Sequence, residues 1–318
     1  MAPLTAGRTN VDSAAVTMSD TLQRRSAGEL NLMHMPLKVS PKGPLIAIGG
    51  AEDKTSESEI LRSVLVLSGE TAPSVGVITT ASSIPEDVFE GYRSAFERLG
   101  ASKVLDVRIR DRADANDPKF VDMIECSDVI FISGGDQMRL TYIFGGSSAL
   151  AAIRHRHAEG ITVAGTSAGA ACQSSTMVYG GSANDSLRKG AVKMSAGFGL
   201  VEGVIIDTHF LERGRFSRLM EVGATNPEYL GVGLGEDAGV LFEDDHILAF
   251  GRGHVIIVDS SETTGSNVFE LSDGEPVSVH NVKMHALVKG YGYRLSDRKV
   301  LSPEDLRGER LEVRIEYT

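Results

Sequence analysis

From Pro44 onward, short apolar runs alternate with longer segments whose apolar residues recur every three or four positions. The short runs predict β-strands and the periodic segments predict amphipathic helices. The predicted strands of the first half are Leu45–Ile48, Val75–Thr79, Val104–Val107, Val129–Ile132 and a run that starts at Ile161. The predicted helices are Ser58–Leu67, Asp87–Leu99, Lys119–Cys126 and a segment that starts at about Gln137. This alternation is typical of an α/β fold with a mostly parallel central sheet and helices on both faces.

The pattern changes after about Gly203. A strand at Val204–Asp207 and a helix at Glu212–Val222 precede several short strands separated by turn residues. These extra C-terminal strands are Gly231–Leu234, Gly239–Phe242, Ile247–Phe250 and His254–Asp259. We expect them to extend the same sheet or to add a second small one. No low-complexity linker follows residue 40, so we predict a single α/β domain over residues 44–318 after a poorly ordered N-terminal extension, residues 1–43.

Composition excludes several classes of protein. The net charge is −11 and no long basic tract is present, so we expect no nucleic-acid partner. No apolar run is long enough for a membrane span, and the polar N-terminus lacks a secretory signal. Two cysteines cannot form a disulfide framework. We therefore expect a cytoplasmic protein that does not bind membranes.

The most distinctive motif is the segment Ile161–Ala171. An apolar, β-branched stretch ends in Gly-Thr-Ser-Ala-Gly, and small helix-forming residues follow. Gly165 and Gly169 let a strand and a helix approach closely, so this pattern predicts a nucleophile elbow with Ser167 at its apex. The alternative is a glycine- and serine-rich loop without chemistry. The strand before Ser167 and the helix after it favour the nucleophile.

A serine nucleophile needs a base, and the base needs an orienting acid. His209 directly follows an apolar strand, at the sheet edge where Ser167 is also expected. The alternative role for His209 is to satisfy the polar groups of a loop. Glu236 follows another apolar strand in a glycine-rich turn and is the predicted acid, with its neighbour Asp237 as the main competitor. Asp207 is less favoured because it lies on the same strand end as His209.

A further glycine-rich strand end, Gly134–Gln137, supplies backbone N–H groups where a helix begins. The N–H groups of Gly135 and Ala168 are the predicted oxyanion hole.

Three arginines, Arg213, Arg215 and Arg218, form a cationic cluster just after His209. They are either a solvated helix face, which the charge pattern alone slightly favours, or an anion clamp. A guanidinium binds a carboxylate through a bidentate fork, so a substrate with carboxylates would explain the cluster.

Together these segments resemble the serine peptidase family that contains cyanophycinase and aspartyl dipeptidase. The matching segments follow the family's order over roughly residues 44–260 and are Ile48–Lys54, Ser133–Gln137, Gly165–Ala170, Asp207–Phe210 with Arg213–Arg215, and Gly231–Glu236. The resemblance implies a glutamine-amidotransferase-like fold, a homodimer, and a serine exopeptidase without cofactor or metal. It implies Ser167 as nucleophile, His209 as base and Glu236 as orienting acid.

The resemblance also implies a substrate. The family hydrolyses cyanophycin, a polyaspartate that carries arginine on each side-chain carboxyl, to β-aspartyl-arginine dipeptides. The residues that fall at the family's substrate-binding positions are Gln137, Asp207, Thr208, Arg213, Arg215 and Arg218. The arginines would hold aspartate carboxylates, and acids such as Asp207 would hold the guanidinium. The family commonly has glutamine where Thr208 stands, and a hydroxyl cannot make the same contacts as an amide.

Two other interpretations stay open. One is an aspartyl or isoaspartyl dipeptidase of the same family, which the arginine cluster disfavours. The other is a catalytically inactive binding protein on this fold, which the presence of Ser167, His209 and Glu236 disfavours. A nicotinamide-binding protein is remote, because Gly49-Gly50 lacks the full G-x-G-x-x-G spacing.

Overall fold

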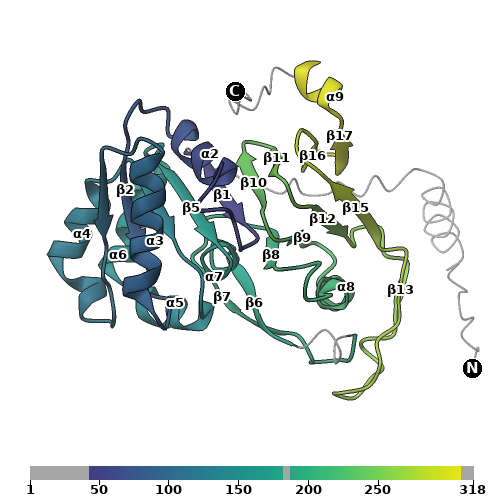
Figure 1. Ribbon diagram of the computed structural model, residues 1–318. Helices are drawn as coiled ribbons and strands as arrows, with labels where there is room; N and C mark the ends of the chain where they lie inside the picture. Colours follow the sequence, from purple (N-terminus) through teal and green to yellow (C-terminus); the bar gives the residue numbers. More distant parts are fainter. Residues whose placement is uncertain (1–42, 182–186, 309–318) are drawn as a thin grey trace, which may run out of the picture. The chain divides into compact units, whose positions relative to one another are not determined.

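A nine-stranded sheet organises the part of the chain that the computed structural model describes, residues 43–181 and 187–308 (Figure 1). Its strand order is β17-β16-β11-β10-β1-β5-β4-β2-β3. The strands from β1 to β3 in this order pair in parallel, and those from β10 to β17 pair antiparallel. The parallel strands are β1 (Leu45–Ile48), β2 (Ser74–Ile78), β3 (Lys103–Asp106), β4 (Val129–Ile132) and β5 (Thr162–Thr166). The antiparallel strands are β10 (Ala238–Glu243), β11 (His246–Gly251), β16 (Gly292–Arg294) and β17 (Lys299–Leu301).

Helices cover both faces of the parallel half, as the sequence predicted (Figure 1). The helices are α2 (Glu59–Leu67), α3 (Pro85–Arg98), α4 (Pro118–Glu125), α5 (Gln137–Phe144) and α6 (Ser148–Ala158), with a 3₁₀ turn η1 (Asp114–Asn116). Side chains alternate along β1: Ile46 and Ile48 pack in the cluster with α2 and α3, whereas Leu45 and Ala47 pack with α4, α5 and α6. Burial on both faces explains why the strand has a continuous apolar sequence.

A second sheet carries the strands that follow residue 203. Its order is β15-β12-β9-β8, with β8 and β9 parallel and the other pairs antiparallel. The strands are β8 (Val204–Thr208), β9 (Leu230–Leu234), β12 (Val255–Asp259) and β15 (Lys283–Leu287). Helix α8 (Phe216–Thr225) packs on it through Leu219 and Val222 against Ile256 and Val258. The C-terminal strands thus both extend the main sheet and build a second one.

The helix predicted over 212–222 was wrong at its start, because α8 begins only at Phe216. Residues 210–215 form a turn instead, in which Gly214 has a φ of +58°. The N–H of Arg213 donates to His209 O, and that of Arg215 donates to Phe210 O. A left-handed residue cannot continue an α-helix, so the turn delays it.

Several short elements had no predicted counterpart. They are the hairpin of β6 (Thr176–Gly180) and β7 (Lys193–Ala196), the pair β13 (Gly265–Ser266) and β14 (Val279–His280), and α9 (Pro303–Gly308). Nearly all of the predicted N-terminal extension lies outside the described residues, so its character and the single-domain boundary stay predictions. None of the helices in the described ranges is long and apolar enough to cross a membrane.

Candidate active site

The predicted elbow is a strained turn between β5 and the short helix α7 (Ala168–Ala171). Ser167 has a φ of 52° and a ψ of −114°, a conformation that non-glycine residues rarely adopt. A Cβ at Gly165 would lie 2.2 Å from the carbonyl oxygen of Gly169, and a Cβ at Gly169 would lie 2.1 Å from that of Ile132. Glycine at both positions therefore allows the helix to lie against the strands, and Ser167 stands at the turn.

Three side chains form a hydrogen-bonded chain at this turn. Ser167 Oγ lies 3.0 Å from His209 Nε2, and His209 Nδ1 lies 2.7 Å from Glu236 Oε1. A carboxylate only accepts, so Nδ1 carries the proton and Nε2 presents its lone pair to the serine hydroxyl. The imidazole is 14% exposed and the Glu236 side chain is 41% exposed, so Glu236 is the most solvent-exposed end of these hydrogen bonds. The arrangement can deprotonate Ser167 as it attacks an acyl group.

The three residues come from two different sheets, which the sequence did not predict. Ser167 follows β5 in the main sheet, whereas His209 follows β8 and Glu236 follows β9 in the second sheet. The end of β1 joins them: His209 N–H donates to Gly49 O at 2.9 Å, and Asp237 N–H donates to Gly50 O at 3.0 Å. The carboxyl ends of four strands thus meet at one place.

Asp237, the competing acid, makes no hydrogen bond or ion pair with His209 in the described structure. Its carboxylate accepts the backbone N–H of Asp53, and burial raises its pKa. Its own φ is +51°, which turns the chain directly after Glu236. The neighbouring glutamate therefore holds the imidazole, and the aspartate holds the loop after β1.

Both predicted oxyanion-hole segments lie beside Ser167. Ala168 is the first residue of α7, so its N–H is at a helix N-terminus. A Cβ at Gly134 would lie 3.0 Å from Ser167 Cβ, so the loop after β4 packs against Ser167. Gly135 has a φ of +142°, and a Cβ there would lie 2.1 Å from Ala81 O. The role of Gly135 and Ala168 as oxyanion donors stays a prediction.

Two of the three clustered arginines pair with Asp207. Arg215 Nη1 lies 3.0 Å from Asp207 Oδ1, and Arg218 Nε lies 3.1 Å from Asp207 Oδ2. Arg215 also donates to Thr208 O at 2.7 Å. Burial raises the pKa of Asp207, and the two guanidiniums oppose that rise. Arg213 is exposed, and within the described residues it makes no hydrogen bond or ion pair; its positive charge acts on the neighbouring Arg218.

The other two predicted substrate residues are also held within the protein. Gln137 Nε2 donates to Val178 O at 3.2 Å, which ties α5 to β6. Thr208 is 5% exposed, and its N–H donates to Asp207 Oδ1. Substrate binding by all six residues stays a prediction.

Sequence reasoning missed a cavity of about 430 Å³ that opens at Ser167 and His209. The loop between β1 and α2 and one face of α3 form its walls; Gln137 and the arginine cluster do not line it. At its base, Glu52 accepts from Thr166 Oγ1 at 2.7 Å, accepts from the hydroxyl of Tyr92 and pairs with Lys54 at 3.2 Å. Glu52 follows a glycine-rich strand end within Ile48–Lys54, a segment that resembles the family. This position was the one sequence feature that could have indicated a role at the site.

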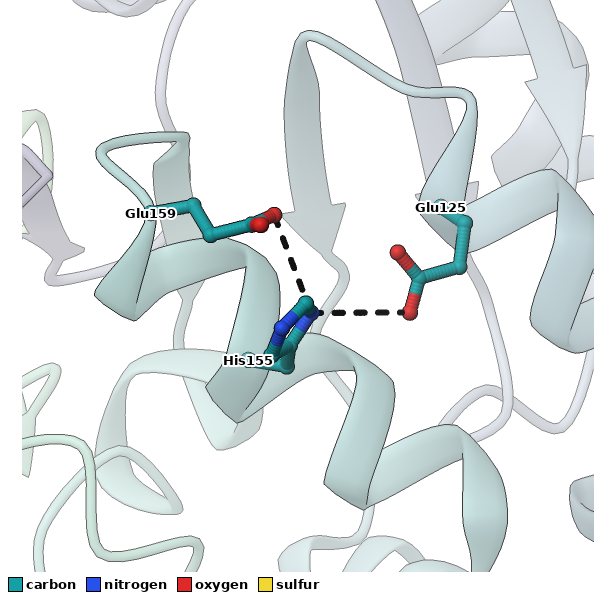
Figure 2. Close-up of side chains that lie close together, drawn as sticks. All are labelled: Glu125, His155 and Glu159. Atoms are coloured by element: carbon teal, nitrogen blue, oxygen red, sulfur yellow. Dashed lines mark ion pairs between the residues drawn. The ribbon is translucent and has the colours of Figure 1, made fainter.

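Away from this site, Glu125, His155 and Glu159 gather on α4 and at the end of α6 (Figure 2). His155 Nδ1 lies 3.7 Å from Glu159 Oε2 and 4.0 Å from Glu125 Oε1. Both helices lead into strands of the main sheet, so the group lies at the edge opposite Ser167. Arg156 already pairs with both glutamates, at 3.0 and 3.9 Å. A cation here would compete with that guanidinium and would lie far from the serine.

Fold and site geometry together define a hydrolase with a serine–histidine–glutamate arrangement on an α/β sheet. The chain belongs to peptidase family S51, whose sequence model matches residues 45–250, and it is a serine-type peptidase. It is 37% identical to a cyanophycinase of Nostoc sp. and 36% identical to one of Trichormus variabilis; each match covers 85% of this chain and 91% of the relative.

A third relative, a cyanophycinase of Geminocystis herdmanii, is 36% identical over 82% of this chain and 96% of its own length. Among solved structures, a peptidase from an acI-B1 Actinobacterium shares the fold, with a TM-score of 0.61 and 20% identity over 81% of this chain and 98% of that chain. The predicted family and fold are therefore confirmed.

Proposed function

We propose that this peptidase hydrolyses cyanophycin and releases β-aspartyl-arginine dipeptides. The observation that carries the proposal is the hydrogen-bonded chain Ser167–His209–Glu236, with contacts of 3.0 and 2.7 Å. The relatives that span most of this chain's length are named cyanophycinases. Their name supports the polymer as substrate, and the hydrogen bonds between Ser167, His209 and Glu236 support hydrolysis by a serine nucleophile.

In the first half-reaction, Ser167 Oγ attacks the carbonyl carbon while its proton moves to His209 Nε2. The carbonyl oxygen becomes an oxyanion, which accepts hydrogen bonds from the N–H groups of Gly135 and Ala168. Such donors contribute roughly 3–4 kcal/mol each to transition-state stabilisation. The imidazolium, held by Glu236, then protonates the leaving amine, and an acyl-enzyme remains on the serine.

In the second half-reaction, a water molecule takes the place of the amine. His209 removes its proton, the hydroxide oxygen attacks the acyl carbon, and the imidazolium returns the proton to Ser167 Oγ. The products are a carboxylate and the free enzyme. Every proton and electron pair is accounted for by this chain's own residues and water.

The test is to incubate the purified protein with cyanophycin and to measure product masses, with Ser167→Ala as control. We expect β-aspartyl-arginine as the main product, and a loss of about 10⁴-fold or more in turnover for the variant. Hydrolysis of short aspartyl peptides but not of the polymer would instead identify a dipeptidase. No hydrolysis of either, or full activity in Ser167→Ala, would contradict the proposal.

The proposal includes the homodimer and the cytoplasmic location expected from the resemblance and the composition. Sedimentation equilibrium tests the first: a mass of one chain, 33.9 kDa, would contradict it. Fractionation of cells tests the second.

A further inference from the structure

The cavity beside Ser167 has one wall made by a single face of α3. Its lining residues on and just before this helix are Ile84, Asp87, Val88, Gly91 and Tyr92. Their spacing of three and four places them on one side of the helix. The opposite wall is the loop after β1, and Ser167 with His209 close one end. Any substrate whose acyl group reaches Ser167 has this space directly beside the scissile bond.

The charges at the base of the cavity are already paired. Glu52 is 3% exposed and accepts from Thr166 and Tyr92. Lys54 Nζ lies 3.2 Å from Glu52 Oε1 and 4.8 Å from the ring centre of Tyr92. A buried carboxylate and an ammonium thus neutralise each other, and neither presents a free charge to a ligand.

Asp87 is the remaining charged residue on the wall. It lies in the first turn of α3, where the helix dipole stabilises an anion. Its side chain is exposed, and it makes no hydrogen bond or ion pair within residues 43–181 and 187–308. The neighbouring Glu86, by contrast, lies 3.5 Å from Arg110 and does not line the cavity. The wall therefore offers one unpaired carboxylate together with the apolar side chains of Val88 and Tyr92.

We propose that this cavity binds an arginyl side chain of the substrate, with its guanidinium on Asp87; this inference rests on the proposed function. An arginine stem is apolar and its end is a planar cation, which matches an apolar wall with a carboxylate at its edge. A bidentate guanidinium–carboxylate pair then fixes the branch beside the reacting carbonyl. Asp207, the acid expected for this role, is buried against Arg215 and Arg218, so Asp87 takes its place.

The test compares two synthetic substrates made of two β-aspartyl-arginine units, one with arginine and one with citrulline, whose urea group is neutral. We expect the wild type to prefer the arginine substrate in kcat/KM, and Asp87→Asn to lower that preference about 10- to 100-fold. Glu86→Gln removes the same charge one residue away and keeps the preference. An unchanged preference in Asp87→Asn overturns this inference, whereas a wild type that hydrolyses neither substrate overturns the proposed function first.

A second variant tests substrate binding in the cavity by changing its volume and leaving all charged residues in place. A Cβ at Gly91 meets no atom within 4 Å, and this position is a regular part of α3. Gly91→Leu therefore fills the cavity, and we expect KM for the arginine substrate to rise about tenfold or more. Gly91→Ala adds much less volume at the same position, so we expect KM to rise less than in Gly91→Leu. Equal KM values in both variants, with thermal stability retained, would contradict binding in this cavity.

Discussion

Gly50 lies so close to His209 that a Cβ at this position would be 2.4 Å from the Cε1 atom of the imidazole. The φ of Gly50 is +107°, which glycine adopts readily and other residues do not. The imidazole of His209 therefore packs directly against the backbone of the loop after β1. Together with the hydrogen bond from His209 N–H to Gly49 O, this contact fixes where Nε2 meets Ser167.

Gly50→Ala is expected to displace the imidazole and to lower kcat about 100-fold, because a shift of about 1 Å at a reacting group has that effect. Gly69→Ala is the matched control: its φ is +75°, and a Cβ there meets no atom within 4 Å. Steady-state kinetics with circular dichroism checks both. If the two variants lose activity equally, backbone strain rather than the contact with His209 is responsible.

The two adjacent acids should respond differently. Glu236→Gln removes the charge that orients His209, and we expect kcat to fall up to about 10⁴-fold, as for the equivalent change in a known triad. Asp237→Asn should keep near-normal kcat, because its carboxylate accepts from Asp53 and asparagine tolerates its φ of +51°. Greater loss in the aspartate variant would reverse our assignment of the acid.

Arg218 should matter for stability. Its side chain is 4% exposed and pairs with Asp207, which is 3% exposed. Arg218→Gln removes one of the two positive charges that compensate the buried charge of Asp207. We therefore expect the free energy of unfolding to fall by about 3–5 kcal/mol. Arg213→Gln, on an exposed residue, should change it by less than about 0.5 kcal/mol. Urea unfolding of both variants decides; equal stabilities would mean that the ion pair with Asp207 contributes nothing.

His157 should make the fold sensitive to acid. It is 4% exposed, its ring nitrogens make no hydrogen bond to any described residue, and burial lowers its pKa from 6.5 to about 4. Below pH 6.5 the unfolded chain binds a proton that the folded chain does not, so stability falls as pH drops toward 4. The full contribution is about 3 kcal/mol.

The comparison for this prediction is His157→Leu, which keeps an apolar side chain in the same place. Urea midpoints of wild type and variant, measured from pH 7 to pH 4.5, should show a steeper decline for the wild type. Parallel declines would mean that His157 is protonated in the folded state as readily as in the unfolded state.

Local chemistry explains which features could be predicted from the sequence. The strands β1 and β4 are buried on both faces and therefore have continuous apolar sequences, and β8 is buried and starts with three apolar residues. The elbow was predictable because Gly165 and Gly169 must be small wherever a helix approaches a strand so closely. Ser167, His209 and Glu236 could be selected from the sequence because each follows a buried strand, and the structure brings the three side chains into hydrogen-bond contact.

The partners of each strand were not predictable, because pairing depends on residues far apart in the chain. His209 was expected at the carboxyl edge of the same sheet as Ser167, yet its strand β8 pairs with β9 in the other sheet. Glu52 and Asp87 were overlooked for the same reason. An acid in the first turn of a helix is ordinarily solvated, and only the packing of α3 beside the elbow places Asp87 on a cavity wall.

The division of Ser167 and His209 between two sheets has a consequence for how the enzyme loses activity. The backbone contacts of Gly49 and Gly50 with His209 and Asp237 bridge the sheets at the site, while each sheet keeps its own ladder of hydrogen bonds. A small displacement of one sheet relative to the other would separate Ser167 from His209 and leave both sets of strand hydrogen bonds intact. Mild denaturant should therefore abolish turnover reversibly while helix and strand content persists. The enzyme would lose activity through displacement of the two sheets, at a lower denaturant concentration than global unfolding.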